Sequence, residues 1–169
     1  MIKILFVCHG NICRSPMAEF VMQHLIAQRG LTEQFEIASA ATSSEEIGNG
    51  IHRGTREKLT QVGIPWSSDK KARQMKQADY MAYDYLIGMD KNNIRNMKRI
   101  CGEDVDGKIH LLLEYTNVGD DIADPWYTGN FDQTYEDVLQ GCTALLQYIL
   151  NNNQNYFLTL KHVYYYILL

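Results

Sequence analysis

The chain lacks the features that mark several classes of protein. No run approaches the roughly 20 apolar residues of a membrane span, and the apolar segment after Met1 is too short for a signal peptide. Acidic residues (20) outnumber Lys and Arg (16), and the net charge of −4 argues against a nucleic-acid partner. The four cysteines do not form a secreted disulfide framework. We therefore expect a cytoplasmic protein, although the sequence leaves export without a leader open.

What is present indicates one α/β domain. The length of 169 residues suits a single domain with a sizeable core, and neither a repeat nor a linker interrupts it. Apolar segments of strand type alternate with amphipathic segments of helix type. The expected strands are 2–7, 35–39, 85–89 and 108–113, and the expected helices are 16–29, 53–62, 91–100 (capped by Asp90) and 131–150. This alternation predicts a four-stranded parallel sheet with helices on both faces, which is Rossmann-like or flavodoxin-like.

One stretch near the start organises the rest. The first apolar strand stops at Cys8, and Gly10 and Asn11 follow, two residue types that tolerate positive φ and let a loop curl. Ser15 and Pro16 then suit the cap and the first position of a helix. The pattern predicts a strand, a tight loop and a helix start in direct succession.

That geometry favours binding of an anion. Inward N–H groups of the loop and the positive end of the helix make a concave anion site. Cys8 lies at its rim, where the field favours the thiolate, and Arg14 offers a fork suited to two phosphate oxygens. A thiolate facing a bound phosphate is arranged for attack on phosphorus. A bare Cys-x5-Arg spacing would more often mean a structural cysteine and a surface arginine, but the strand-to-helix context favours the phosphate site.

A proton donor is needed to expel an oxygen leaving group. Asp124 and Pro125 lie in a predicted long loop, 114–130, and long loops in compact domains are usually functional. Pro125 holds Asp124 in an extended conformation, and a carboxyl group that faces an occupied anion site tends to keep its proton. The alternative is an ordinary turn, since Asp-Pro is common in turns.

The run Val-Cys-x-Gly-Asn-Ile-Cys-Arg-Ser-Pro, residues 7–16, resembles the signature of the low-molecular-weight protein tyrosine phosphatases. Further matching segments follow in order: 39–43, 46–49, 72–74, 89–90 and 124–125. The resemblance covers about residues 2–150. It implies hydrolysis of phosphotyrosine in proteins through a cysteinyl-phosphate, without metal or cofactor. Cys8 would be the nucleophile, Arg14 the phosphate clamp, and Asp124 the general acid and then the base.

The resemblance also assigns supporting roles within the phosphate-binding loop. Asn11 would pin the shape of the loop, with Ser39 supporting it, and Ser15 would stabilise the departing thiolate while capping the helix. Cys13 would close a reversible disulfide with Cys8; the alternative is a small buried hydrophobic residue, which is the usual state of a free cysteine. The loop as a whole would comprise Cys8, His9, Gly10, Asn11, Ile12, Cys13, Arg14 and Ser15, with His9 a neighbour rather than a catalyst. The remaining cysteines, Cys101 and Cys142, are expected in the core.

Residues around the cleft bear on the substrate. Trp126 and Tyr127 would wall a deep cleft and stack on an aromatic ring. Ile12 favours phosphotyrosine, because members of the family that act on phosphoarginine carry threonine there. Two positions depart from the family. Glu45 replaces an aromatic residue on the opposite wall and would repel anionic substrates, and Lys70 replaces the histidine that supports the loop asparagine in animal members.

Two other functions share the anion loop. A thioredoxin-coupled arsenate reductase needs two further cysteines close together, and Cys101 and Cys142 are far apart in the sequence. A phosphocysteine carrier or phosphate-binding module needs no proton donor, so Asp124 argues against it. We expect a phosphotyrosine protein and a phosphate ion as partners, and a monomer or weak homodimer. The phosphatase domain is expected to span 1–155, and the apolar extension 156–169 would lengthen the last helix, add an edge strand or pair with another copy.

Overall fold

The four strands of the computed structural model form one parallel sheet, as predicted. The structure describes residues 1–153, so the extension 156–169 lies outside the described residues. The strand order is β2-β1-β3-β4. The strands are β1 (Ile2–Cys8), β2 (Phe35–Ala41), β3 (Tyr85–Gly88) and β4 (Ile109–Leu111). At the carboxyl ends of the central strands, Cys8 pairs with Ala41 and Val7 pairs with Gly88.

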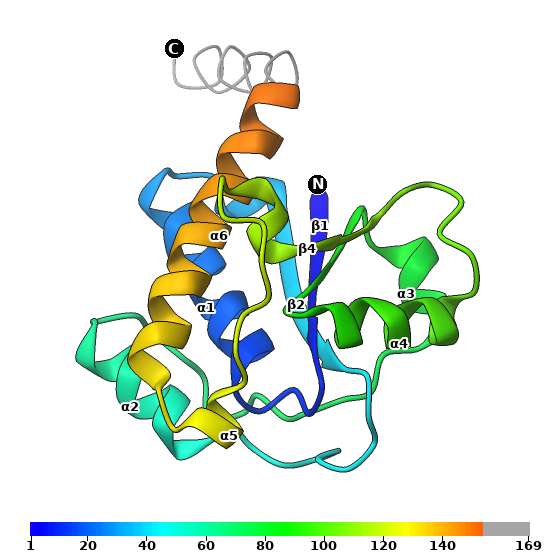
Figure 1. Cartoon of the computed structure of the whole chain (residues 1–169). Coiled ribbons are helices and arrows are strands. Elements are labelled where there is room, and N and C mark those ends of the chain that lie inside the picture. Colours follow the sequence, from blue (N-terminus) through cyan, green and yellow to red (C-terminus); the bar gives the residue numbers. More distant parts are fainter. Residues whose placement is uncertain (154–169) are drawn as a thin grey trace, which may run out of the picture.

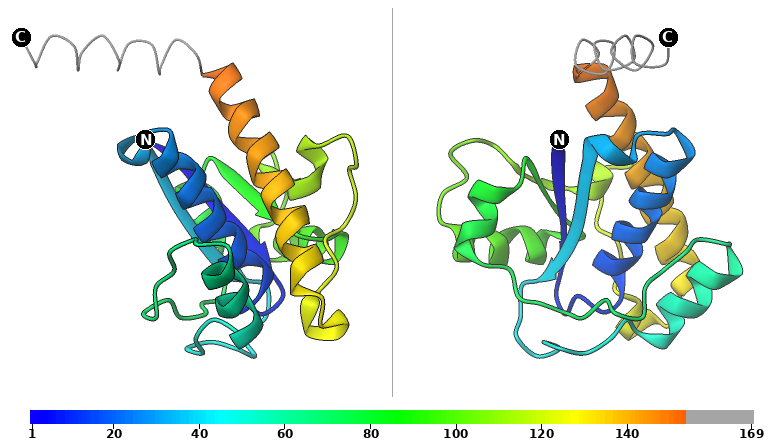
Figure 2. Two further views of the ribbon diagram at one scale, coloured as in Figure 1. Left: turned by 90° about the vertical axis from the view of Figure 1, so that its left-hand side faces the viewer. Right: turned by 180° about the vertical axis from the view of Figure 1, so that it is seen from behind.

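Helices cover both faces of the sheet, which confirms the predicted layers. Helices α1, α2 and α6 lie on one side of the sheet, and α3 and α4 lie on the other (Figure 1). Helices α1 and α6 run side by side along the same face (Figure 2). The α-helices are α1 (Arg14–Gln28), α2 (Arg53–Gln61), α3 (Gln77–Ala82), α4 (Lys91–Cys101), α5 (Pro125–Thr128) and α6 (Phe131–Asn152), and the 3-10 turns are η1 (Thr32–Gln34) and η2 (Leu112–Tyr115).

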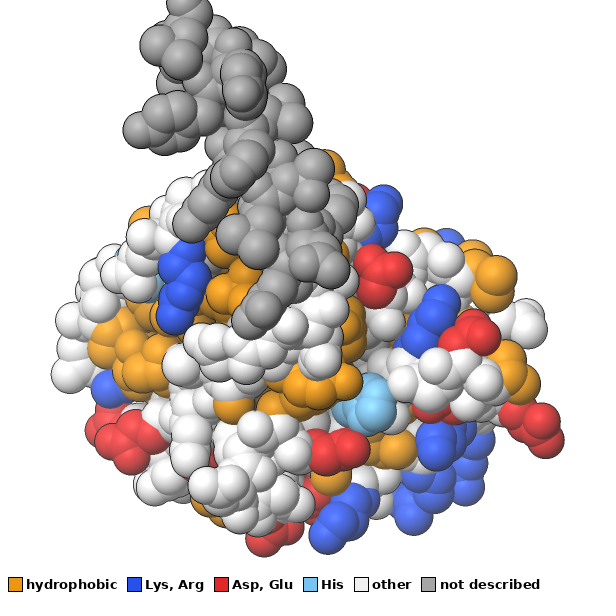
Figure 3. All heavy atoms as spheres, turned by 90° about the horizontal axis from the view of Figure 1, so that it is seen from above, with side chains coloured by type: hydrophobic (Ala, Val, Ile, Leu, Met, Phe, Trp, Pro, Cys, Tyr) orange, Lys and Arg blue, Asp and Glu red, His pale blue; other side chains and the backbone are white. Residues whose placement is uncertain are grey.

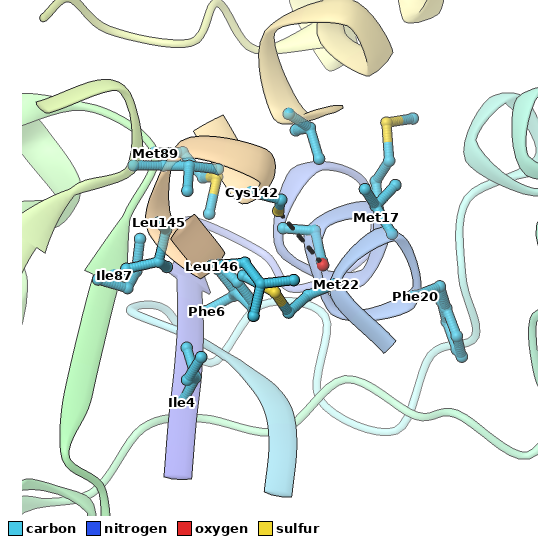
Figure 4. Packing of buried hydrophobic residues seen from close by; sticks show 14 of the residues in the cluster. Ile4, Phe6, Met17, Phe20, Met22, Ile87, Met89, Cys142, Leu145 and Leu146 are labelled. Atoms are coloured by element: carbon cyan, nitrogen blue, oxygen red, sulfur yellow. Dashed lines mark hydrogen bonds between the residues drawn. The ribbon is translucent and has the colours of Figure 1, made fainter. Parts of the chain in front are cut away.

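The central strand β1 is buried on both faces, and its side chains alternate between two cores. Ile4 and Phe6 pack with residues of α1 and α6 in the larger cluster, drawn in Figure 4. Leu5 and Val7 point to the other face and pack with residues of α4. Each fully buried aliphatic or aromatic side chain contributes about 1.5–3 kcal/mol to folding. The strand that ends at Cys8 is therefore held by packing on both faces of the sheet.

Two sequence expectations about secondary structure were wrong, and one helix was not predicted. Helix α1 begins at Arg14, with Cys13 in the capping position, so Ser15 is not the cap. Its hydroxyl instead contacts Cys8 Sγ. The expected loop 114–130 contains α5, which Asp124 caps by accepting a hydrogen bond from Trp126 N–H. The short helix α3 was not predicted, because among its six residues only Tyr80 is buried and no periodic apolar face exists.

The functional end of the fold lies at the carboxyl ends of the strands, the lower end in Figure 1. The loop after β1, the loop after β2 and helix α5 all lie at this end. The opposite end, seen in Figure 3, carries side chains of both charges scattered among hydrophobic ones. Within residues 1–153, no helix is both long and apolar enough to cross a membrane. Parallel sheets bind ligands beyond the carboxyl ends of their strands, so the loop after β1 lies where a ligand is expected.

Candidate active site

The thiol of Cys8 lies at the end of β1, in the loop that leads into α1. Cys8 is 3% exposed, and its Sγ lies 3.0 Å from Ser15 Oγ. The backbone N–H of Asn11 donates to the same sulfur over 3.3 Å. Because both groups can donate to sulfur, they stabilise negative charge on it. The loop thus curls back on the thiol, as the sequence predicted.

Asn11 fixes the shape of this loop. It is the only non-glycine residue among the described ones with positive φ, at 57°. Its amide Nδ2 donates to Ser15 Oγ at 2.9 Å and to Ser39 Oγ at 2.8 Å, and its Oδ1 accepts from Arg73 N–H at 3.2 Å. Three side-chain hydrogen bonds offset the cost of the left-handed conformation, which is about 1–2 kcal/mol. Asn11 therefore joins the loop to β2 and to the segment before α3.

Gly10 is required for space rather than for positive φ. The sequence argument gave Gly10 and Asn11 the same role, but Gly10 is absent from the described residues with positive φ. A Cβ at Gly10 would lie 3.2 Å from Glu46 Cγ. The loop therefore packs closely against the segment after β2, and this contact brings Glu46 to the edge of the site.

An ion pair between buried Glu19 and half-buried Lys70 supports the hydrogen-bond network of Asn11. Ser39 Oγ donates to Glu19 Oε2 at 2.5 Å, and Lys70 Nζ lies 2.7 Å from the same carboxylate oxygen. Lys70 also donates to Ser39 C=O at 3.2 Å. Lys70 is thus connected to Asn11 through Ser39. A lysine in the position where animal relatives were expected to carry histidine can still hold the network, because it supplies a fixed positive charge.

Arg14 is buried and held by two carboxylates. Its side chain is 3% exposed; Nη1 lies 2.5 Å from Asp90 Oδ2 and donates to Ile122 C=O at 3.0 Å. Nη2 lies 2.6 Å from Asp124 Oδ2. Burial opposes the charge of Arg14, but Cys8, Asp124 and Asp90 outweigh burial and raise its pKa. Nε is buried and has no hydrogen-bond partner among the described residues. A buried, unpaired N–H on a permanent cation is a donor suited to an anion.

Asp124 and the two predicted cleft walls meet above the thiol. A cavity of about 120 Å³ is bounded by Cys8, Ile12, Asp124, Trp126 and Tyr127, among other residues. Cys8, the candidate nucleophile, is almost fully buried where it lines this cavity. Trp126 and Tyr127, in contrast, are 58% and 83% exposed. The cavity therefore has a polar, buried floor and an aromatic, exposed rim.

The cavity is also bounded by the predicted wall residue Glu45. Its Oε2 lies 2.9 Å from Nε2 of His9, a residue of the phosphate-binding loop. Both residues, together with Glu46, bound the same cavity. The three residues that the sequence assigned to the cleft walls, Glu45, Trp126 and Tyr127, thus bound one cavity. The His9 ring contacts Glu45 and not the sulfur of Cys8.

The other cysteines are not placed like Cys8. Burial is the main cause that raises the pKa of Cys13 to about 12, with the charges of Cys8 and Asp124 adding to it, so Cys13 stays a thiol at neutral pH. Cys101 and Cys142 are buried, as predicted, but in separate core clusters on opposite faces of the sheet. Cys142 donates to Ala18 C=O over 3.7 Å (Figure 4). All four described cysteines are free.

Comparison with known proteins identifies the family. The family model described as low molecular weight phosphotyrosine protein phosphatase matches residues 3–155. The chain belongs to this family. The low molecular weight protein-tyrosine-phosphatase YfkJ of Bacillus subtilis is 40% identical over 156 residues, which are 91% of this chain and 99% of YfkJ. By homology this chain is likewise a low-molecular-weight protein tyrosine phosphatase.

Solved structures of relatives share the fold. The crystal structure of YfkJ gives a TM-score of 0.86 over 90% of this phosphatase and 96% of the YfkJ chain. The Streptococcus pyogenes enzyme SP-PTP is 41% identical, with a TM-score of 0.78 over 87% of this chain and 92% of its own. A Drosophila protein described as an arginine phosphatase is 29% identical, with a TM-score of 0.79 over 88% and 97%. This fold is therefore also found in a protein described as an arginine phosphatase.

Sequence reasoning missed three residues of this phosphatase's site. Asp90 was expected only to cap α4, which it does by accepting from Asn93 N–H at 2.7 Å, but it also holds Arg14. Glu19 and Arg73 join the Asn11 network from α1 and from the segment before α3. Asp90 directly follows an apolar strand of a parallel sheet, and this position was a usable signal. Arg73 lies in the matching segment 72–74 but was given no role, and Glu19 gave no signal, because only the folded packing brings it to Ser39 and the Asn11 network.

Proposed function

We propose that this phosphatase hydrolyses phosphotyrosine in proteins with Cys8 as nucleophile, Arg14 as phosphate clamp and Asp124 as general acid and base. The observation that carries the proposal is that Cys8 and Asp124 bound one cavity, and that Arg14, whose Nη2 lies 2.6 Å from Asp124 Oδ2, keeps a buried Nε without a partner among the described residues. A phosphate dianion needs donors on several oxygens, and the loop N–H groups and Arg14 supply them.

In the first step the sulfur of Cys8 attacks phosphorus. The P–S bond forms as the P–O bond to the tyrosine breaks, and Asp124 gives its proton to the leaving phenolate oxygen. Arg14 Nη2 donates to Asp124, so a phosphate oxygen that takes this donor releases the carboxyl for the leaving group. In the second step Asp124 acts as the base and the sulfur of Cys8 is the leaving group. Asp124, now ionised, takes a proton from water, the water oxygen bonds phosphorus, and the P–S bond breaks.

The groups around Cys8 stabilise the thiolate at both ends of the cycle. Ser15 Oγ and Asn11 N–H are the donors in reach of the sulfur. Asn11 depends in turn on Ser39, which Glu19 and Lys70 hold. These residues are positioning residues in the proposal. Cys13 has a distinct expected part, a reversible disulfide with Cys8, which stays a prediction.

Depth and aromatic walls favour phosphotyrosine as the substrate. A side chain must carry its phosphate from the exposed rim at Trp126 and Tyr127 down to the buried Cys8. Phosphotyrosine is longer than phosphoserine, and its ring can stack on the walls. Ile12, at the cavity, presents no hydroxyl to a phosphoarginine.

Hydrolysis of three matched peptides tests the proposal. Phosphotyrosine, phosphoserine and phosphoarginine peptides of otherwise identical sequence would be incubated with wild type, Cys8→Ser and Cys101→Ser, without added metal. We expect hydrolysis of the phosphotyrosine peptide by wild type and Cys101→Ser, and none by Cys8→Ser. Hydrolysis by Cys8→Ser would overturn the assignment of the nucleophile.

Two further measurements separate the rival functions: phosphorylation of the protein, and oxidation of thioredoxin in the presence of arsenate. A carrier would become phosphorylated without turnover. A thioredoxin-coupled arsenate reductase would oxidise reduced thioredoxin when arsenate is added. Cys101 and Cys142 lie on opposite faces of the sheet, which disfavours a disulfide relay from Cys8.

A further inference from the structure

The segment after β2 contributes carboxylates to the rim of the cavity. Glu45 and Glu46 bound the cavity that Cys8 also lines, and no lysine or arginine is among its described lining residues. Among the described residues that line the cavity, His9 is the one whose side chain could carry positive charge. Arg14, the cation of the site, is buried below. Positive charge therefore lies at the floor and negative charge at the mouth.

Glu45 is held in place at this mouth and remains open to a partner. Its side chain is 70% exposed, and one carboxylate oxygen, Oε2, contacts His9 Nε2. His9 is itself anchored, because it belongs to the loop whose shape Asn11 fixes, and His9 C=O accepts from Ser43 N–H at 3.0 Å. A carboxylate has about four acceptor positions, so one contact leaves Glu45 able to accept from a second cation.

Glu46 adds charge from a fixed position next to Glu45. Its Oε2 accepts from Asn49 Nδ2 at 2.7 Å, and its Cγ packs against the space at Gly10. Glu46 is half-buried, whereas Glu45 is exposed. Glu45 is thus the carboxylate of the pair that a residue beside the phosphotyrosine would meet.

We propose that Glu45 makes the site prefer phosphotyrosine with a lysine or arginine next to it in the peptide. The inference rests on the proposed function and names its substrate class. The dianionic phosphate at the floor and a cationic flank at the mouth match the two charges of the site. An acidic flank meets like charges there and is disfavoured. The aromatic wall at Trp126 and Tyr127 takes the tyrosine ring and does not distinguish the flanks.

Relative kcat/KM for charged-flank peptides tests this preference. Phosphotyrosine peptides with Lys, Ala or Glu immediately before or after the phosphorylated residue would be compared on wild type, Glu45→Gln and Glu33→Gln. Glu33 is an exposed carboxylate in η1, at the amino end of β2, so it is a matched control far from the mouth. An exposed pair is worth about 0.2–1 kcal/mol. We therefore expect Lys over Ala by up to about fivefold and a larger Lys-over-Glu ratio.

The preference for a basic flank should depend on the charge of Glu45 and on the salt concentration. The ratio should approach one in Glu45→Gln, persist in Glu33→Gln, and shrink when salt rises from about 0.02 M to about 0.3 M. Equal rates on all flanks, or a ratio kept in Glu45→Gln, would overturn the inference while leaving the phosphatase assignment intact. Failure to hydrolyse any phosphotyrosine peptide would overturn both. Because Gln is isosteric and position 45 is exposed, equal melting temperatures of the three proteins are expected and serve as the folding check.

Discussion

The floor and the rim of the site are built in opposite ways. The floor consists of buried groups tied by short hydrogen bonds: Asn11 alone makes three through its side chain, and Lys70 and Glu19 form an ion pair that supports it. The rim consists of exposed side chains with few contacts, such as Tyr127 and Glu45. The floor performs a step that is the same for every substrate, so it must be rigid. The rim meets the variable part of the substrate, and changes there leave the chemistry intact.

The largest expected effect concerns Asp124, which connects the two regions. Asp124→Asn removes the proton donor for the leaving oxygen, and kcat should fall about 10²–10⁴-fold on a phosphotyrosine peptide. An aryl phosphate with an acidic leaving group needs little protonation, so its rate of cysteine phosphorylation should fall much less. Single-turnover kinetics with both substrates would measure this. Equal losses on the two would contradict the assignment of Asp124 as acid.

The next effect probes the support of the floor. Lys70→Met leaves Glu19 charged and buried, which should lower the free energy of unfolding by about 3–5 kcal/mol and lower kcat as Asn11 loses its support. The matched control is Lys3→Met, whose pair with Glu36 is exposed and should cost about 0–1 kcal/mol. Urea unfolding would measure both. The double variant Glu19→Gln/Lys70→Met should recover part of the loss, and no recovery would speak against the ion pair as the cause.

A pH effect is expected from Cys13. Its pKa, raised from 9.0 to about 12 mainly by burial, means that the fold favours the neutral thiol. That stabilisation is fully present below pH 9 and is lost as pH rises from 9 to 12, by at most about 1.4 kcal/mol per pH unit. The free energy of unfolding of wild type should therefore fall relative to that of Cys13→Ala over this range. Parallel curves would show that Cys13 is not the group concerned.

The smallest effect belongs to the rim. Trp126 is backed by the His52 ring at 5.7 Å, which in turn stacks on Phe131 at 5.2 Å. Trp126→Ala should raise KM for a phosphotyrosine peptide by about two- to tenfold through lost stacking, with kcat and the melting temperature nearly unchanged. Inorganic phosphate, which has no ring, should inhibit both proteins equally. A fall in kcat as large as that of Asp124→Asn would break the division between floor and rim.

The residues of the loop could be predicted because their chemistry is local. Cys8, Asn11 and Arg14 stand within one short run, and the strand-to-helix pattern fixes where their groups point. Asp124 could be placed because the carboxyl ends of parallel strands share one edge. Its partner Asp90 also stood at that edge, but a helix cap satisfied it and concealed its second contact.

The errors have equally local causes. Ser15 and Pro16 have the sequence of a helix start, yet the helix begins at Arg14 because the Ser15 hydroxyl is taken by the Cys8 thiol and the Asn11 amide. Helix α5 is a single turn with one buried residue, Pro125, so it has no apolar period to detect. Glu19 in α1 and Lys70 in the segment before α3 are far apart in the sequence, and they meet only in the folded structure, beside Ser39 of β2.

The central claim is that phosphoryl transfer passes through the sulfur of Cys8. Wild type and Asp124→Asn would be mixed with a phosphotyrosine peptide, quenched within one turnover, digested under conditions that preserve thiophosphates, and analysed by mass spectrometry. The account predicts one phosphoryl group on the peptide that carries Cys8, and none in Cys8→Ser. A phosphoryl group on His9, on Cys13 or on no residue of the chain would contradict it.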